Sequence, residues 1–188
     1  MRGQTTGLTP HGDTCRQDYR EKREADVITK ELFMECVEKS IEVNAPVQQV
    51  YNQWTQFEDF PQFMEGVERV QQMDNKHLHW VAEIGGKRKE WEAEIFEQVP
   101  DEKIAWRSTS GARNFGVVHF RPIDSEHTEV HLKMNYEPEG ATEHLGDMLG
   151  LVGRRVEGDL KRFKDFLQKR QQETGAWRGS IHHGRQTS

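Results

Sequence analysis

The sequence contains few cysteines and no long apolar run. Its 188 residues include only Cys15 and Cys36, too few for a framework of several disulfide bonds. No stretch approaches the roughly 20 apolar residues that cross a bilayer, so no transmembrane segment is predicted. The opening residues, MRGQTTGLTPHGD, lack the apolar segment of a signal peptide. A cytoplasmic protein is the expectation that follows.

A basic surface and the common catalytic motifs are also missing. There are 26 Lys and Arg residues against 32 Asp and Glu residues, and the formal net charge is −6. Nucleic acid is not an expected partner, because phosphate backbones require clustered basic residues. The chain has no glycine-rich phosphate loop, no spaced cysteine cluster, no HExxH and no nucleophile elbow. No cofactor is therefore predicted, and the common hydrolase and nucleotide-enzyme classes are disfavoured.

The composition predicts one folded domain with irregular ends. With 34% apolar residues, the chain supplies one hydrophobic core and little material for a second. Residues 1–34 are predominantly polar and are predicted to form a mobile leader. The regular patterns fall within residues 35–172. Residues 173–188 are predicted to form a flexible tail, in which Trp177 is the exception because an indole favours contact with the domain over water.

The segment from residue 76 to residue 96 predicts a β-hairpin. Two alternating stretches flank Gly85-Gly86, and a Gly-Gly pair suits a two-residue turn because both positions accept a positive φ. This turn places Trp80 opposite Trp91 and Leu78 opposite Ala93 on one apolar face. The other face is acidic and solvated, as is typical of an antiparallel sheet that is wetted on one side.

The remaining patterns complete an α+β arrangement. Residues 37–43 alternate as a first strand, residues 45–56 predict a helix, and a second short helix begins near residue 57. Residues 67–73 form the next strand, and further strands follow at regular intervals. A long amphipathic helix is predicted over residues 141–171. The expected fold is a curved seven-stranded antiparallel sheet with two short helices after the first strand, gripped by the long C-terminal helix.

Extending the hairpin register through the later turns places the inward side chains in rows across the sheet. One bulky row fills its end of the sheet and consists of Ile95, Trp106, Val118 and Leu132. The next row is mostly small and consists of Leu78, Ala93, Ser108, Gly116 and Met134. The row beyond is aromatic and polar and consists of Trp80, Trp91, Ser110, Asn114 and Tyr136, with Lys89 one step further out. This succession predicts a void beneath the long helix.

The first half of the long helix is expected to cover that void. It contains glycines that weaken a helix by about 1 kcal/mol each and leave room for a guest, namely Gly146, Gly150, Gly153 and Gly158. Basic residues such as Arg155 and Arg162 are expected to face solvent. The predicted ligand-binding residues are Trp80, Trp91, Trp106, Ser108, Ser110, Asn114, Gly116, Met134, Tyr136, Lys89, Leu149 and Val152. Alternatively, the small residues let the helix pack closely against the sheet without a cavity.

Several stretches resemble a known family in their amino-acid sequence, and the predicted elements follow the same order as in that family. The segments YNQWTQFEDFPQFMEGV, HLHWVAEIGG, IAWRS and RRVEGDLKRFKDFL are similar to a bacterial member of the polyketide cyclase/dehydrase branch of the START-like (SRPBCC) superfamily. The resemblance covers roughly residues 35–171 and implies the helix-grip fold with a hydrophobic-ligand cavity between sheet and long helix. Relatives include lipid and coenzyme-Q binding proteins as well as aromatase/cyclases. The resemblance does not imply a particular reaction.

The candidate chemical groups favour binding over catalysis. His77 and His79 share a charged face, and His119 is expected opposite His131 on the outer face, so no metal site is predicted. An enzyme would use Tyr136 and Lys89 as acid and base with Asn114 at an oxyanion, but no catalytic residue is assigned. The predicted function is binding or carrying a hydrophobic small molecule, either a lipid, an isoprenoid or quinone, or a polyketide-like compound. The alternatives are a polyketide cyclase or dehydratase and a partner-binding protein without a cavity.

Overall fold

A computed structural model describes residues 34–138 and 145–187, with side chains in the long helix from residue 150 onward. Residues Glu35–Ser188 form one compact unit. The predicted leader and Cys15 lie outside the described residues, apart from Met34. The fold described below is that of the unit beginning at Glu35.

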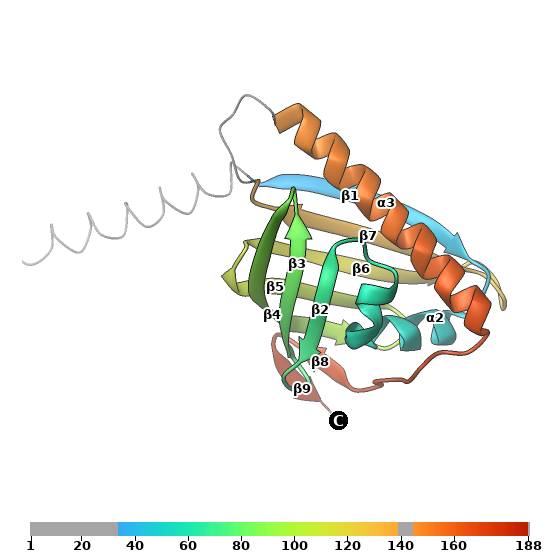
Figure 1. The fold of residues 1–188 in the computed structure, drawn as a ribbon. Helices are drawn as coiled ribbons and strands as arrows, with labels where there is room; N and C mark the ends of the chain where they lie inside the picture. Colours follow the sequence, from blue (N-terminus) through green and yellow to red (C-terminus); the bar gives the residue numbers. More distant parts are fainter. Residues whose placement is uncertain (1–33, 139–144, 188) are drawn as a thin grey trace, which may run out of the picture. The chain divides into compact units, whose positions relative to one another are not determined.

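A large antiparallel sheet and one long helix dominate this unit (Figure 1). The strands are β1 (Glu35–Val43), β2 (Val67–Gln72), β3 (His77–Ile84), β4 (Lys87–Val99), β5 (Lys103–Gly111), β6 (Asn114–Pro122), β7 (Thr128–Tyr136), β8 (Ser180–His182) and β9 (Arg185–Thr187). The helices are α2 (Val47–Trp54), the 3₁₀-helix η1 (Phe57–Gln62) and α3 (Leu145–Arg170). The main strand order is β1-β7-β6-β5-β4-β3-β2. The predicted helix-grip fold is confirmed, with two additional strands after α3.

The two short helices close one end of the sheet. Pro46 precedes α2, which buries Val50, Tyr51 and Trp54 against the sheet and α3. The second short helix forms as the tighter η1, which contains Pro61. Proline removes a backbone donor, so a short irregular helix is the expected outcome at this position.

The second half of α3 seals the core at this end. Its apolar residues recur at steps of three and four, and Val156, Leu160, Phe163 and Leu167 are between 0 and 7% exposed. The ring centroid of Phe163 lies 4.8 Å from that of Trp54. Figure 1 shows α3 lying beside β1 and reaching the short helices at its C-terminal end. The closed part of the core therefore lies where α3 meets α2 and η1.

The chain after residue 172 differs from the predicted flexible tail. Ile181 in β8 pairs with Gln98 of β4 and is fully buried, and Trp177 packs against the core. The backbone N–H of Thr174 donates to Gln53 Oε1 at 3.0 Å. Gln53 is itself fully buried. Since buried polar groups require partners, the tail is ordered by the polar side chains of α2 as well as by its own apolar residues.

The register of the sheet follows the prediction in one hairpin and departs from it in the next. Trp80 pairs with Trp91 across β3 and β4, as predicted from the Gly-Gly turn. Across β5 and β6, however, Trp106 pairs with Gly116 and not with Val118. The register between β4 and β5 also shifts after Glu92. The bulge after Glu92 changes which face Ser110 lies on, because it adds a residue to one strand only. The pairing of β5 with β6 is continuous but is offset by two residues from the predicted rows.

Candidate functional site

Two stacked tryptophans form the most distinctive feature of the inner face. The rings of Trp80 and Trp91 lie 5.4 Å apart between centroids and are inclined by only 10°. Trp80 also meets Phe60 of η1 edge-on at 5.7 Å. Both tryptophans are half-buried. The turn that brings them together contains Gly85 and Gly86 at φ values of 60° and 75°. The structure thus provides a flat indole surface at the predicted place.

Trp106 fills the position where the sequence predicts a void. A Cβ added to Gly116 would lie 2.7 Å from two carbons of the Trp106 indole and 2.6 Å from the Lys133 carbonyl oxygen. Trp106 Nε1 donates to Asn114 Oδ1 at 3.1 Å. The predicted row beside Gly116 is therefore occupied, and the small residue accommodates an indole from the neighbouring strand. It accommodates neither an empty chamber nor the long helix.

The amide of Asn114 connects this indole to the β5–β6 turn. Asn114 Nδ2 donates to the Ala112 carbonyl oxygen, and the Asn114 backbone N–H donates to Ser108 Oγ, each at 3.0 Å. Both groups of the amide thus have partners within the protein. Ser108 is half-buried, whereas Ser110 pairs with Glu92 and is exposed. The predicted placement of Ser110 on the inner face is wrong, because the bulge after Glu92 turns it outward.

Tyr136 carries a buried hydroxyl without a partner. It lies opposite Asn114 on β7, and its ring packs against the core. Among the described residues, none forms a hydrogen bond with its Oη, which is inaccessible to solvent. Burial raises the pKa of this hydroxyl, and the negative charge of Glu35 adds to the rise. Leaving such a group unsatisfied costs about 1–3 kcal/mol.

Burial decreases along α3 toward its N-terminal half. Val156 is 7% exposed, whereas Val152 is half-buried and Leu151 is 52% exposed. Several side chains of the sheet are likewise half-buried and pack against the core, namely Trp80, Trp106, Met134 and Tyr136. We call this region, together with Trp91, the aromatic groove. Lys89 is half-buried and lies two residue pairs nearer the β3–β4 turn than Trp91. Leu149 lies in α3, but its side chain is outside the described part.

Gly150, Gly153 and Gly158 of α3 do not face the aromatic groove, and Gly146 lies outside the part of the helix whose side-chain surroundings are described. A Cβ added to Gly150 or Gly158 would first meet the guanidinium of Arg154 or Arg162, at 3.4 and 3.1 Å. A Cβ on Gly153 would meet only the Lys39 side chain of β1, at 3.9 Å. The expectation that these glycines leave space for a guest is therefore wrong. Arginine side chains four residues later lean back over them, as side chains on a helix do.

The histidine pairs lie on the outer face. His119 and His131 face each other with ring centroids 6.3 Å apart, and His131 Nε2 lies 2.8 Å from Glu38 Oε1. Burial, followed by the charge of Arg121, lowers the pKa of His119. His77 Nδ1 lies 2.8 Å from Asp74 Oδ2. Within residues 34–138 and 145–187, no three His, Cys, Asp or Glu side chains are grouped so that they could hold a metal ion.

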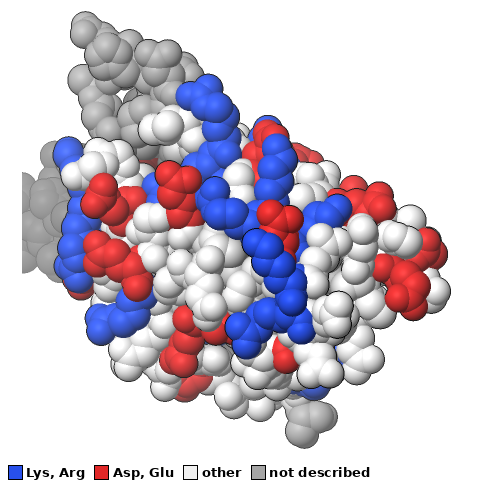
Figure 2. All heavy atoms as spheres, turned by 45° about the vertical axis from the view of Figure 1, so that its right-hand side comes forward, with Lys and Arg blue, Asp and Glu red and all other residues white. Residues whose placement is uncertain are grey.

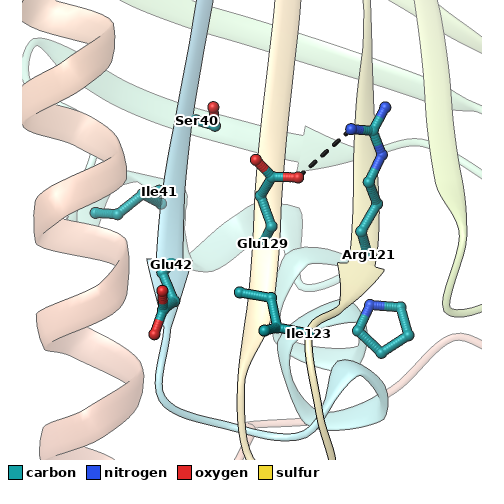
Figure 3. A pocket seen from close by; sticks show the side chains of 7 residues that line it. Ser40, Ile41, Glu42, Arg121, Ile123 and Glu129 are labelled. Carbon is teal, nitrogen blue, oxygen red and sulfur yellow. Dashed lines mark hydrogen bonds and ion pairs between the residues drawn. The ribbon is translucent and has the colours of Figure 1, made fainter.

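A shallow hollow also lies on the outer face, over β1, β6 and β7 (Figure 3). Its lining consists of Ser40, Ile41, Glu42, Arg121, Pro122, Ile123 and Glu129. Arg121 and Glu129 form an ion pair across it at 3.4 Å. None of the predicted ligand-binding residues borders this hollow, and its paired charges do not suit a hydrophobic ligand.

Three polar residues of α3 contact the loop before β2. None of them is among the ligand-binding residues predicted from the sequence. Arg162 Nε donates to the Phe63 carbonyl oxygen at 2.8 Å, and Asp159 Oδ1 accepts the backbone N–H of Glu65 at 2.8 Å. The guanidinium of Arg155 donates to the carbonyl oxygens of Glu65 and Glu83. Arg155 and Arg162 were expected to face solvent. Their spacing with Asp159, at steps of four and three, places all three on one helix face and was the available signal.

The comparisons with known proteins assign the family. Residues 43–165 match the family described as "Polyketide cyclase / dehydrase and lipid transport". The chain belongs to this family. It is also 53% identical over 149 residues to an uncharacterized 17.2 kDa protein of Streptomyces lincolnensis from the melC2-rnhH intergenic region. That alignment covers 79% of this chain and 99% of the relative.

Solved structures with low sequence identity to this chain share its fold. A START superfamily protein from Mycobacterium smegmatis aligns with a TM-score of 0.64 at 16% identity, over 71% of this chain and 97% of the other. The Zhui aromatase/cyclase from Streptomyces sp. R1128 aligns with a TM-score of 0.61 at 18% identity, over 77% and 99%. At these identities the likeness establishes the START-like fold. None of the described helices is long and apolar enough to cross a membrane.

Proposed function

We propose that this protein binds or carries a hydrophobic small molecule in the aromatic groove, between the sheet and the first half of α3. The observation that carries the proposal is the change of burial along α3. The same inner surface is sealed beneath Val156, Leu160 and Phe163, yet remains half-buried beside Val152. A ligand at this level would complete a core that the protein leaves open.

The chemistry of the groove suits a planar or greasy molecule. The Trp80–Trp91 pair offers an indole face, and Trp106 has its only donor satisfied by Asn114. Tyr136 is the inward-facing polar group whose hydroxyl has no described partner. A mainly apolar lining with few polar groups is typical of sites for lipids, isoprenoids, quinones or polyketide-like compounds.

Binding is tested with cis-parinaric acid, a fluorescent fatty acid, titrated into the full-length protein. Trp91→Ala is expected to weaken uptake at least tenfold, because it removes one face of the stack while leaving Trp80 on Phe60. The control is Phe115→Ala, which removes a 45% exposed aromatic side chain from the outer face. Equal uptake by the wild type and both variants would place the probe elsewhere, and no uptake by the wild type would favour a partner-binding protein.

A cyclase or dehydratase is the second candidate, because the buried Tyr136 hydroxyl has no hydrogen-bond partner among the described residues. Its raised pKa keeps the phenol protonated at neutral pH, so it would act as a proton donor and not as a base. Turnover of a polyketide-like substrate should then fall at least a hundredfold in Tyr136→Phe while probe binding is retained. Unchanged turnover in this variant would remove Tyr136 from any catalytic role.

A further inference from the structure

Arg155 joins α3 to two separate parts of the fold. Its Nη1 donates to the Glu83 carbonyl oxygen at 2.9 Å, and its Nη2 donates to the same oxygen at 3.0 Å and to the Glu65 carbonyl oxygen. Glu83 is the residue before Ile84 at the end of β3, and Glu65 lies in the loop between η1 and β2. One guanidinium therefore holds a helix, a loop and a hairpin together.

The backbone around this guanidinium is shaped to receive it. Gly66 has a φ of 70°, and a Cβ at this position would collide with Arg155 Nη2. The Gly66 carbonyl oxygen accepts the Glu83 backbone N–H at 2.7 Å, which ties the loop to β3 directly. Glycine at this position serves both the left-handed backbone and the close approach of the arginine.

The same contact lies at the edge of the aromatic groove. Glu83 is three residues from Trp80 along β3, or about 10 Å at the usual rise of a strand. On α3, Arg155 stands between the half-buried Val152 and the buried Val156. Beyond Glu83, the turn at Gly85 and Gly86 has no described atom within 4 Å of an added Cβ. The guanidinium thus connects α3 to the end of β3 that leads into this open turn.

Arg155 reaches backbone carbonyl oxygens of two other elements, whereas Arg162 of the same helix reaches one, that of Phe63. Figure 2 shows Lys and Arg side chains following one another down the face over this helix. Lys161 pairs with Glu157 on the surface, and Arg154 is exposed. Arg155 instead donates to backbone carbonyl groups of two other elements. Its neighbour Arg154 has the same charge and length without these contacts, which makes it a matched control.

We infer that Arg155 is a positioning residue that controls ligand access, by holding the β3–β4 hairpin against α3 at the entrance of the aromatic groove. This inference rests on the proposed function. Hydrogen bonds from a charged donor are stronger than neutral ones, so their loss raises the population in which hairpin and helix separate. Because ligand enters and leaves through the same opening, association and dissociation become faster together. The equilibrium affinity then changes little, since the groove itself is unaltered.

Stopped-flow mixing of cis-parinaric acid with the full-length protein tests this inference. In Arg155→Gln, both rate constants are expected to rise about tenfold while their ratio stays within about twofold of the wild type. Arg155→Lys retains the charge but cannot span two carbonyl groups, so its rate constants should lie between those of the wild type and Arg155→Gln. Arg154→Gln should match the wild type. Without ligand, hydrogen exchange at the Glu83 amide should accelerate in Arg155→Gln while the β6–β7 amides remain protected.

The outcomes separate this inference from the proposed function. Uptake by the wild type with identical rate constants in Arg155→Gln and Arg154→Gln would overturn the role of Arg155 and leave ligand binding intact. A large loss of affinity without faster association would assign Arg155 to maintaining the site and would also overturn the inference. Absence of uptake by the wild type would overturn the proposed function itself, and with it the inferred role of Arg155 in ligand access. If Arg155→Gln fails to fold, Arg155→Lys decides by the same two rate constants.

Discussion

Gly116 is required by the indole that faces it. Trp106 lies over the glycine from the adjacent strand, and the Lys133 carbonyl oxygen borders it on the other side. Glycine weakens a strand interior because it contributes no side chain to the packing. Covering such a glycine with an aromatic side chain from the next strand restores that packing. At this position the identity of one residue is thus determined by the side chain of another.

Gly116→Ala is therefore expected to destabilise the protein by about 1–3 kcal/mol, since the added methyl displaces the indole or the backbone. Chemical denaturation followed by tryptophan fluorescence measures this change. Gly153→Ala provides the opposite case, because its Cβ would find only Lys39 at 3.9 Å and alanine favours helix by up to about 1 kcal/mol. Stability that is unchanged or increased in Gly116→Ala would show that Trp106 does not pack there.

At the scale of elements, α2 has a polar side that serves the C-terminal chain. Asn52, Gln53 and Thr55 are 4%, 0% and 2% exposed, which is unusual for these residue types. Asn52 Nδ2 donates to Glu173 Oε1 at 2.9 Å, and Thr55 Oγ1 accepts the Trp177 backbone N–H at 3.0 Å. The segment after α3 thus supplies hydrogen-bond partners for these buried polar side chains and then extends the sheet with β8. It contributes to the fold although it follows the matched family region, residues 43–165.

Ile181→Ala should reveal this contribution. Removing a fully buried side chain costs about 2–5 kcal/mol, which lowers the melting temperature on the order of 5–15 °C for a domain of this size. Thermal unfolding by circular dichroism measures the shift. Arg185→Ala, at an exposed position of β9, should leave the melting temperature within about 2 °C. Identical melts for both variants would mean that β8 does not stabilise the domain in solution.

At the scale of the whole unit, the fold combines a sealed end with an open end. Aromatic contacts among Trp54, Phe60, Phe63 and Phe163 close the core where α3 meets the short helices. The buried Tyr51 hydroxyl accepts from Gln98 Nε2 at 2.9 Å, and burial raises its pKa to about 12. Toward the N-terminal half of α3, Val152 is only half-buried, and the Tyr136 hydroxyl has no hydrogen-bond partner in the described part of the chain. Under the proposed function, this division would let a stable core and a ligand-binding groove coexist in one sheet.

Local patterns in the sequence were sufficient for the elements and for the first hairpin. Apolar periodicity distinguished strands from the long helix, and Gly85-Gly86 set the register that stacks Trp80 on Trp91. A two-residue turn leaves no freedom in the pairing that follows it, so local chemistry determines a contact between residues eleven positions apart. The family resemblance and the order of elements were accessible for the same reason.

Tertiary structure alone decided the contacts that depend on bulges, long side chains and distant segments. A bulge near Glu92 moved Ser110 outward, and the two-residue offset between β5 and β6 placed Trp106 over Gly116, because a register shift cannot be read from alternation alone. Arg155 appeared to be an ordinary surface residue, yet its long side chain reaches two carbonyl groups on other elements. The order of the segment after α3 likewise depends on buried polar groups of α2, more than 120 residues earlier. Such contacts arise from packing in three dimensions, and no periodicity along the chain encodes them.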